Sequence, residues 1–283
     1  MISRRGFLKG VLGAGLAGAT LGGGVLAEGY WLGPGRVVVE DTSVAVKGLP
    51  EGFEGFTICQ LTDIHHGAMV DMDFIEKVVG MANALGPDLF VLTGDYVSRS
   101  RRYISPVADL LATLRSRFGT FAVLGNHDHW VGGRRMRDAL TAGGIRILRN
   151  RHDFIEAGGG RICIAGVGDL RTDRPDARAA LSGVEDDIPR IVLSHHPDYA
   201  ESIPSDVRVD LVMAGHTHGG QVRLPVFNYA PYLPSRYGQR YRGGLVRRGS
   251  LQVYVSRGIG MVNVPVRFNC PPEITMVRLV GAG

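Results

Sequence analysis

Side chains that could bind metal ions gather in five short segments of the chain. Eight of the nine histidines lie in or beside these segments and only His152 lies elsewhere, so a random scatter of surface histidines is a poor explanation. Carboxylates, an amide and imidazoles, without thiolates, are typical ligands of Mn, Fe or Zn. The segments contain, in order, Asp63 and His65; Asp95; Asn126, His127 and Asp128; His195 and His196; and His216 and His218.

Seven candidate ligands in these segments are more than a single ion with an open coordination position needs. Two ions that share a bridging carboxylate would use all seven. Such a pair, about 3.5 to 4 Å apart, can clamp a phosphate and lower the pKa of bound water toward neutrality. The residue types therefore predict hydrolysis of phosphate esters without a covalent enzyme intermediate.

The segment AGHTHGGQ, residues 214–221, places two histidines one residue apart. In an extended chain residues i and i+2 point to the same side, so His216 and His218 would be presented together, one to each ion. Glycines are expected to let the backbone turn sharply and to leave room for a substrate beside the ions: Gly94, Gly125, Gly215, Gly219 and Gly220.

Apolar runs separate the polar segments and predict the elements that position them. Strands are expected at 56–65, 88–97 and 120–130, alternating with one-sided helices at 72–86, 106–119 and 134–144. Seven further strands are expected at 146–150, 153–157, 161–170, 190–198, 209–224, 251–260 and 273–280. This order predicts one layered α/β domain in which two sheets pack together. Each polar segment falls at the carboxyl end of a strand, where open α/β sheets gather ligands.

The motifs DIHHG, GDYV, GNHDHW, SHHP and GHTHGGQ, in this order, resemble those of the calcineurin-like metallophosphoesterases, from about Phe56 to Thr275. RGIG followed by PVRFNCPPEIT is similar to the ending of the bacterial twin-arginine-exported or membrane-anchored branch. The resemblance implies a four-layer α/β/β/α sandwich of two mixed β-sheets flanked by helices.

The resemblance also implies roles for single residues. Asp63, His65 and His218 would hold the first metal ion, Asn126, His195 and His216 the second, and Asp95 would bridge them. His127 would not be a ligand; it would stabilise the transition state and protonate the leaving oxygen.

The segment GDYVSRS departs from the GDYVDRG of the protein-phosphatase branch. The aspartate that orients the acid histidine there is Ser98 here, and we hypothesise that Ser98 hydrogen-bonds His127 more weakly. Arg99 aligns with an arginine that contacts phosphate, so it is either a catalytic substrate clamp or one more solvated arginine. Three histidines that flank ligands are expected to pack or to support them: His66, His129 and His196.

The first 31 residues look like a targeting segment rather than part of the fold. SRRGFLK closely resembles the twin-arginine export signal, and the uncharged stretch 10–27 ends in small residues that suit cleavage. At about 1.5 Å per residue this stretch is also just long enough for a membrane anchor. We therefore expect a signal peptide or anchor at 1–31, the twin-arginine translocase as a partner, and one metallophosphoesterase domain at 36–283. The odd number of cysteines argues against a disulfide framework.

The export signal predicts a location in the periplasm or cell envelope, with anchoring to the cytoplasmic membrane as an alternative. Without Arg4, Arg5 and Lys9 the net charge falls from +5 to +2, so the composition indicates no nucleic-acid partner. Aromatic and arginine side chains in 223–244 suit a substrate lip that meets lipid headgroups or a membrane surface, and an ordinary proline-rich loop is the alternative.

We expect hydrolysis of phosphodiesters or phosphomonoesters, and the resembled branch suggests phospholipid or lipid-linked substrates. Three alternatives stay open. A UDP-2,3-diacylglucosamine pyrophosphatase-like enzyme of lipid A synthesis is disfavoured because that reaction is cytoplasmic, and a nuclease of the same fold is disfavoured by the near-neutral charge. A non-catalytic metal-binding scaffold is disfavoured because all seven ligand positions and His127 are filled.

Overall fold

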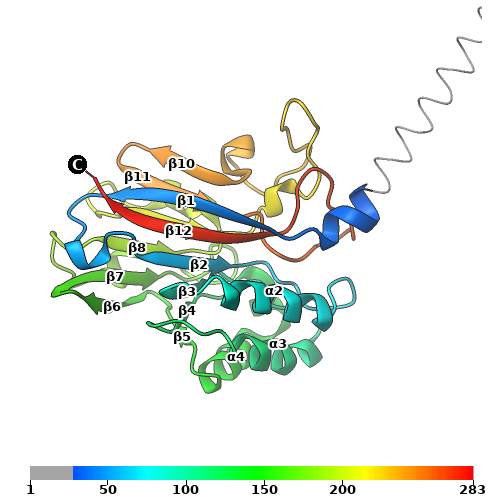
Figure 1. The fold of residues 1–283 in the computed structure, drawn as a ribbon, viewed down its shortest axis with the longest axis horizontal. Helices are drawn as coiled ribbons and strands as arrows, with labels where there is room; N and C mark the ends of the chain where they lie inside the picture. The colour runs from blue at the N-terminus through cyan, green and yellow to red at the C-terminus, as the bar shows by residue number, and fades with distance from the viewer. Residues whose placement is uncertain (1–27, 283) are drawn as a thin grey trace, which may run out of the picture.

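The structure is a computed structural model that describes residues 28–282 (Figure 1). It begins with a π-helical turn, η1 (Glu28–Leu32), and a 3-10 turn, η2 (Gly33–Gly35), which contact the body of the domain: the Arg267 N–H donates to the Gly29 carbonyl at 2.8 Å. Residues 1–27 of the expected targeting segment lie outside the described residues. Among residues 28–282, no helix combines the length and the apolar character needed to cross a bilayer.

Two six-stranded sheets form the centre of the molecule. The first has the order β1 (Val38–Val46), β12 (Glu273–Gly281), β2 (Thr57–Leu61), β3 (Leu89–Leu92), β4 (Thr120–Ala122) and β5 (Arg146–Ile147). The second has the order β10 (Gly244–Arg248), β11 (Leu251–Val255), β9 (Leu211–Ala214), β8 (Arg190–Leu193), β7 (Gly160–Gly166) and β6 (Arg151–Ala157). Both are mixed, because β12 is antiparallel to β2, β10 to β11 and β6 to β7, while the other neighbours are parallel.

The two sheets pack face to face over a buried apolar core. Ile58 and Val91 of the first sheet belong to the same buried cluster as Ile164 and Leu193 of the second. Polar contacts also join the sheets: the Gln60 side-chain amide donates to the Ala214 carbonyl at 3.0 Å, and the Gln252 side-chain amide donates to the Ala45 carbonyl at 2.7 Å. The Gln60 contact lies directly beneath the loops that carry the polar segments.

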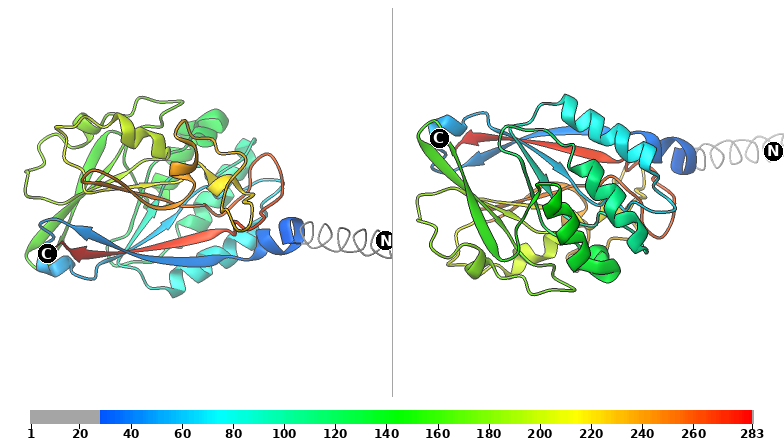
Figure 2. Two further views of the ribbon diagram at one scale, coloured as in Figure 1. Left: turned by 90° about the horizontal axis from the view of Figure 1, so that it is seen from above. Right: turned by 90° about the horizontal axis from the view of Figure 1, so that it is seen from below.

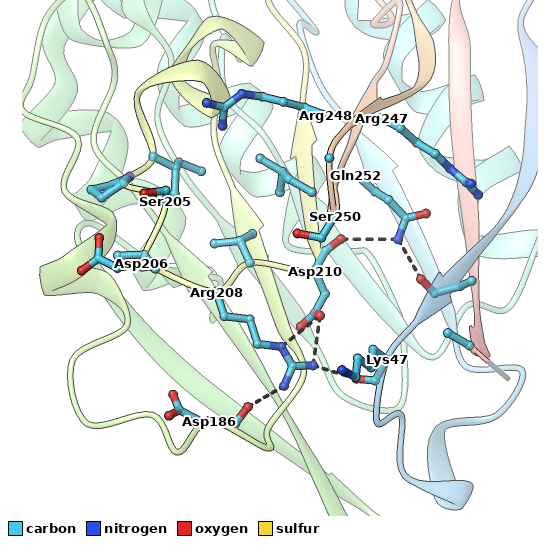
Figure 3. Close-up of a pocket in the computed structure, with 18 residues that line it drawn as sticks. Lys47, Asp186, Ser205, Asp206, Arg208, Asp210, Arg247, Arg248, Ser250 and Gln252 are labelled. Atoms are coloured by element: carbon cyan, nitrogen blue, oxygen red, sulfur yellow. Dashed lines mark hydrogen bonds and ion pairs between the residues drawn. The ribbon is translucent and has the colours of Figure 1, made fainter.

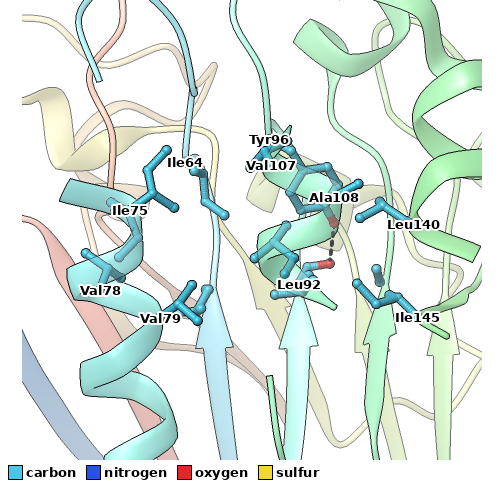
Figure 4. Packing of buried hydrophobic residues seen from close by; sticks show 14 of the residues in the cluster. Ile64, Ile75, Val78, Val79, Leu92, Tyr96, Val107, Ala108, Leu140 and Ile145 are labelled. Carbon is cyan, nitrogen blue, oxygen red and sulfur yellow. Dashed lines mark hydrogen bonds between the residues drawn. The ribbon is translucent and has the colours of Figure 1, made fainter. Parts of the chain in front are cut away.

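Three helices cover the outer face of the first sheet (Figures 1 and 2): α2 (Met72–Ala84), α3 (Ile104–Leu111) and α4 (Asn126–Ala142). In α2 the apolar residues Ile75, Val78 and Val79 repeat at helical spacing and point toward the sheet, where Leu92 is buried (Figure 4). Because both faces of the central strands are covered, strands such as β3 are apolar throughout.

The outer face of the second sheet has a thinner cover. It consists of α5 (Ala177–Ala180), the turn η5 (Pro197–Ser202) and loops, and Tyr199 and Tyr241 are buried against it. The expected four-layer α/β/β/α sandwich is therefore confirmed, with an outer layer made mainly of loops on one side. The remaining short turns are η3 (Glu51–Phe53), η4 (Arg101–Tyr103), η6 (His218–Gly220) and η7 (Gly238–Tyr241).

The boundaries of the expected elements differ most from those in the structure after β4. The strand expected at 120–130 ends at Ala122, and Asn126 begins α4, so the motif GNHDHW forms a helix start rather than a strand end. The helix expected at 106–119 spans only Ile104–Leu111. The strands β1 and β10 were not among those expected, and β12, at the end of the chain, inserts between β1 and β2 in the first sheet.

Candidate metal centre

The five polar segments meet beyond the carboxyl ends of the parallel strands, as predicted. The loop after β2 carries Asp63 and His65, the loop after β3 carries Asp95, and α4 begins with Asn126 after β4. In the second sheet, His195 follows β8, while His216 and His218 follow β9. The carboxylate and imidazole donor atoms among them form overlapping groups whose members lie within 4.8 Å of one another, so two sheets contribute to one centre.

The first donor set contains Asp63, His65 and His218. Asp63 Oδ1 lies 3.2 Å from His218 Nε2, and the Nε2 atoms of His65 and His218 lie 3.1 Å apart. Donor atoms that share one ion at about 2.0 to 2.2 Å have separations of this size. All three side chains are buried, so the set fits one divalent ion.

The second donor set contains His195 and His216, and the resemblance assigns Asn126 to the same ion. His195 Nε2 and His216 Nδ1 lie 3.2 Å apart. Asn126 Oδ1 is buried and accepts no hydrogen bond from any described residue. Because a buried amide oxygen without a partner is costly, a bound cation is a natural partner for it.

Asp95 lies between the two sets. Its Oδ2 is 3.1 Å from His195 Nε2 and 3.6 Å from His65 Nε2, while its Oδ1 accepts the main-chain N–H of His127 at 2.8 Å. One carboxylate oxygen thus faces both donor sets. This geometry fits the bridging role that the resemblance implies for Asp95.

Hydrogen bonds on the far side of the rings fix which nitrogens face the centre. His195 Nδ1 lies 2.8 Å from the Thr93 carbonyl, which can only accept, so Nδ1 keeps a proton and Nε2 is the nitrogen that faces the centre. His65 Nδ1 lies 2.9 Å from Ser98 Oγ. The hypothesis that Ser98 bonds His127 is therefore wrong, because the loop after β3 aims Ser98 at His65 instead.

The carboxylates and imidazoles in the centre strongly shift one another's pKa values. Burial raises the pKa of Asp95, but the neighbouring His195 and His65 outweigh it and bring that pKa down to about 2. Burial disfavours a charge on His195 as well, yet Asp95 and Asp63 raise its pKa to about 10. Burial lowers the pKa of His65 to about 3, despite the attraction of Asp95. His65 is therefore neutral at neutral pH, whereas His195 must release a proton before it can bind an ion.

Five of the seven candidate ligands have left-handed backbone conformations. Their φ angles are 52° at Asp63, 52° at His65, 57° at Asp95, 68° at His216 and 50° at His218. Non-glycine residues rarely adopt this region, and such strain concentrates at functional sites. The expectation that His216 and His218 share a side of an extended chain is thus wrong. Left-handed turns, not strand alternation, direct them to different donor sets.

The glycines around the centre make room for the carboxylates. A Cβ atom on Gly125 would lie 2.2 Å from Asp95 Oδ1, and one on Gly215 would lie 2.1 Å from Asp63 Oδ2. Atoms of neighbouring loops lie equally close to Gly94, Gly219 and Gly220. The expectation that these glycines leave space for the substrate is therefore wrong: side chains and main chain of the protein occupy that space.

His127 lies at the edge of the centre and is only partly buried. Its ring packs edge-on against His65 at 4.7 Å and against the exposed Trp130 at 4.8 Å between ring centres. Burial lowers the pKa of His127, against the attraction of Asp95, which disfavours its protonated form. Arg99 is exposed, with a φ of 60°, in the same loop as Ser98.

Two aspartates support the centre in ways that the sequence did not predict: Asp128 was named only as one of the polar residues of its segment, and Asp169 was not named. Asp128, in the first turn of α4, accepts the N–H groups of Asp95, Tyr96 and Gly125 at 2.8 to 2.9 Å, which fixes the loop that carries Asp95. Its place in the GNHDHW motif was the available signal.

Asp169, in the loop after β7, lies 2.7 Å from His196 Nδ1 through its Oδ2 atom. The His196 ring stacks on His216 at 3.7 Å between ring centres. This contact confirms the expected supporting role of His196. His66, which packs edge-on against Tyr103, is likewise a packing residue. No motif pointed to Asp169.

A large cavity lies at the opposite end of the strands, between the end of β1 and the start of β9 (Figure 3). Its volume is about 860 Å³, but its central polar groups bind one another: the Arg208 guanidinium pairs with Asp210 at 3.0 Å and donates to the Lys47 carbonyl at 2.7 Å. None of the candidate ligands lines it. Size alone therefore does not locate the chemistry in this molecule.

Comparison with known proteins gives a consistent result. The chain is 37% identical over 282 residues to the uncharacterized metallophosphoesterase YkuE of Bacillus subtilis, covering 98% of both chains. It is 35% identical over 229 residues to phosphodiesterase YaeI of Escherichia coli, covering 80% of this chain and 82% of that one.

Among solved structures, the NAD nucleotidase NadN of Haemophilus influenzae matches with a TM-score of 0.50 and 16% identity. The match covers 72% of this chain and 45% of that one, and it supports the fold alone. The model of the calcineurin-like phosphoesterase family matches residues 56–220, the range that contains all seven candidate ligands. The chain therefore belongs to the calcineurin-like phosphoesterases and is a metal-dependent phosphoester hydrolase.

Proposed function

We propose that the protein hydrolyses phosphodiester or phosphomonoester bonds of phospholipid or lipid-linked substrates at the cell envelope. The observation that carries the chemical part is the pair of buried donor sets that share Asp95 Oδ2. Oxygen and nitrogen donors without thiolates favour Mn, Fe or Zn as the two ions. When bound, such ions activate water and neutralise charge on the phosphate.

His127 is the proposed proton donor to the leaving oxygen. It stands at the partly open edge of the centre, and its main chain is anchored to Asp95. An approaching phosphate is anionic, so it would raise the lowered pKa of His127 and favour the protonated ring. General acid catalysis of this kind contributes roughly 10² to 10⁴-fold to a rate. Arg99, exposed beside Ser98, is the proposed clamp for a phosphate oxygen.

The envelope part of the proposal rests on the sequence of the first residues. SRRGFLK and the uncharged stretch that follows favour passage through the twin-arginine translocase, with either cleavage or retention as an anchor. The name of the relative YaeI, a phosphodiesterase, favours a diester substrate. Together these features favour an envelope lipid over a soluble cytoplasmic metabolite.

The test is incubation of the Mn²⁺-loaded full chain with an envelope lipid extract, followed by mass spectrometry of released headgroups. We expect water-soluble phosphate esters to be released by the native chain and at least 100-fold more slowly by His127→Ala, with His152→Ala as a control that remains active. Turnover of DNA, RNA or UDP-2,3-diacylglucosamine in place of these lipids would assign one of the alternatives and overturn the proposed substrate class.

A further inference from the structure

Apart from Trp130, exposed hydrophobic side chains near the metal centre lie on three segments of the chain. Two of them lie at the tip of the loop between Leu224 and Tyr229, where Val226 is 96% exposed and Phe227 is 78% exposed. We call the following set the apolar rim: Leu32, Leu224, Val226, Phe227, Tyr229, Tyr232 and Val264.

The tip of the rim is a constrained turn. The Leu224 N–H donates to the Tyr229 carbonyl at 2.8 Å, and the Phe227 N–H donates to the Pro225 carbonyl at 2.8 Å. Val226 has a φ of 71°, which is strongly disfavoured for a β-branched residue. The fold thus accepts backbone strain at the position where it presents its most exposed hydrophobic side chain.

Hydrogen bonds brace the tip against the loop that carries His218. The buried Arg223 donates to the Gly219 carbonyl at 2.9 Å and, through its other nitrogen, to Asn228 Oδ1 at 3.4 Å. A Cβ atom on Gly220 would lie 2.6 Å from the Tyr232 carbonyl, so that part of the rim also packs on the metal loop. These contacts therefore hold the rim in a fixed position relative to the metal centre.

Hydrogen bonds also connect the metal loop to the other two segments of the rim, around Val264 and around Leu32. The Gln221 side chain donates to the carbonyls of Val264 and Val266 at 3.2 Å, and the Arg267 N–H donates to Gly29 in η1. Figures 1 and 2 show η1, the loop before β12 and the loop after β9 at the same end of the molecule. The uncharged sequence stretch 10–27 joins the described chain at Glu28, on this rim.

Polar groups lie just inside the rim. Tyr232 lines a cavity of about 570 Å³ together with Arg171, Arg236 and His196, the ring that stacks on the candidate ligand His216. Both arginines are exposed and form no ion pair with any carboxylate of residues 28–282. Asp198 also lines this cavity and accepts the Arg236 main-chain N–H at 2.8 Å, so the surface changes from apolar at the rim to charged near the metal centre, with two arginine side chains that could meet anionic headgroups.

From this arrangement, we infer that the apolar rim inserts into an anionic phospholipid bilayer and holds the metal centre over the headgroups. A bilayer suits the rim better than a protein partner, because the uncharged sequence stretch 10–27 directly precedes Glu28 beside the rim, and arginines without a carboxylate ion pair accompany the exposed aromatic side chains. The inference deepens the proposed function and rests on it for the identity of the substrate.

The test places an environment-sensitive NBD dye at the tip. Cys59, Cys163 and Cys270 are buried, so a cysteine introduced by Val226→Cys can be labelled selectively in the full chain. The matched control is Leu85→Cys, which is 37% exposed at the end of α2, just before β3 begins and away from the donor sets. We expect a blue shift and a several-fold rise in emission at position 226 with phosphatidylcholine–phosphatidylglycerol vesicles, and no change at position 85.

Unchanged emission at position 226 would overturn the inference, and it would leave a protein partner as the occupant of the rim. A second variant separates this outcome from failure of the proposed function. Val226→Asp with Phe227→Asp should keep its turnover of soluble bis-p-nitrophenyl phosphate but lose at least tenfold on vesicle-borne lipid. Absence of turnover of the soluble ester in the native chain would contradict the enzyme itself, whatever the dye reports.

Discussion

The candidate ligand rings are oriented by hydrogen bonds on the side away from the centre. The Thr93 carbonyl and Ser98 Oγ hold the Nδ1 atoms of His195 and His65, which leaves the Nε2 atoms facing Asp95. Such supporting bonds commonly account for 10 to 100-fold in metal affinity. The residue types predicted a metal centre, but the partners of the rings depend on loops that no motif describes.

Metal binding should release a proton from His195. With a pKa of about 10, its imidazole is protonated at neutral pH in the ion-free chain, because Asp95 and Asp63 overcome the effect of burial. Binding must displace that proton, so the apparent affinity for Mn²⁺ should rise about tenfold per pH unit between pH 6 and 8. Calorimetric titrations in buffers of different ionisation enthalpy measure the protons released. The control is His152→Gln, because His152 lies outside the centre. An affinity of the native chain for Mn²⁺ that does not change with pH would show that His195 releases no proton on binding.

The loops that join the strands to the following elements pack closely on one another, and these contacts bring the two donor sets together. Gly125 precedes α4 and touches the Asp95 carboxylate, while Gly215 follows β9 and touches the Asp63 carboxylate. Arg267, fully buried before β12, donates to the carbonyls of Gly260 and Cys270 at 3.1 Å and so orders the loops beside His218. These contacts join segments that are far apart in the sequence.

Gly125→Ala should disable the centre while leaving the fold intact. The added Cβ atom would lie 2.2 Å from Asp95 Oδ1, so the carboxylate must move by an ångström or more. Misplacement of this size costs about 100-fold in rate. The measurement is kcat/KM on bis-p-nitrophenyl phosphate, with circular dichroism to check the fold.

The matched control is Gly80→Ala, since Gly80 is an exposed residue in α2 and a Cβ atom there meets nothing within 4 Å. Alanine should leave activity unchanged and raise the free energy of unfolding by about 0.5 to 1 kcal/mol. Native activity in Gly125→Ala would show that Asp95 needs no fixed position.

The sequence predicted elements well where periodicity was strong and poorly where loops decide. The apolar repeat of α2 and the runs in β2, β3, β8 and β9 were found because buried faces impose them. The strand expected through residue 130 was wrong because Asp128 binds three main-chain N–H groups and starts a helix at Asn126. The i and i+2 argument for His216 and His218 gave the right division between the donor sets for the wrong reason, since left-handed turns direct them.

At the scale of the whole molecule, the candidate metal centre lies at one edge of two sheets that pack face to face. Four strands of each sheet are neighbours in a parallel run, and the candidate ligands lie beyond the carboxyl ends of β2, β3, β4, β8 and β9. The order of strands was beyond sequence reasoning, because β12 returns from the end of the chain to pair with both β1 and β2. The part of the apolar rim between Leu224 and Tyr232, in contrast, follows directly from the composition of the segment after the last metal motif.

We infer that two metal ions, held by donor sets that share Asp95, carry out the hydrolysis of phosphoesters by this chain. The most direct measurement is turnover of bis-p-nitrophenyl phosphate as Mn²⁺ is titrated into chelator-treated full chain, with bound metal measured at each point. We predict that turnover reaches its plateau at two ions per chain and is lost in Asp95→Asn. A plateau at one ion per chain, or native turnover in Asp95→Asn, would contradict the claim.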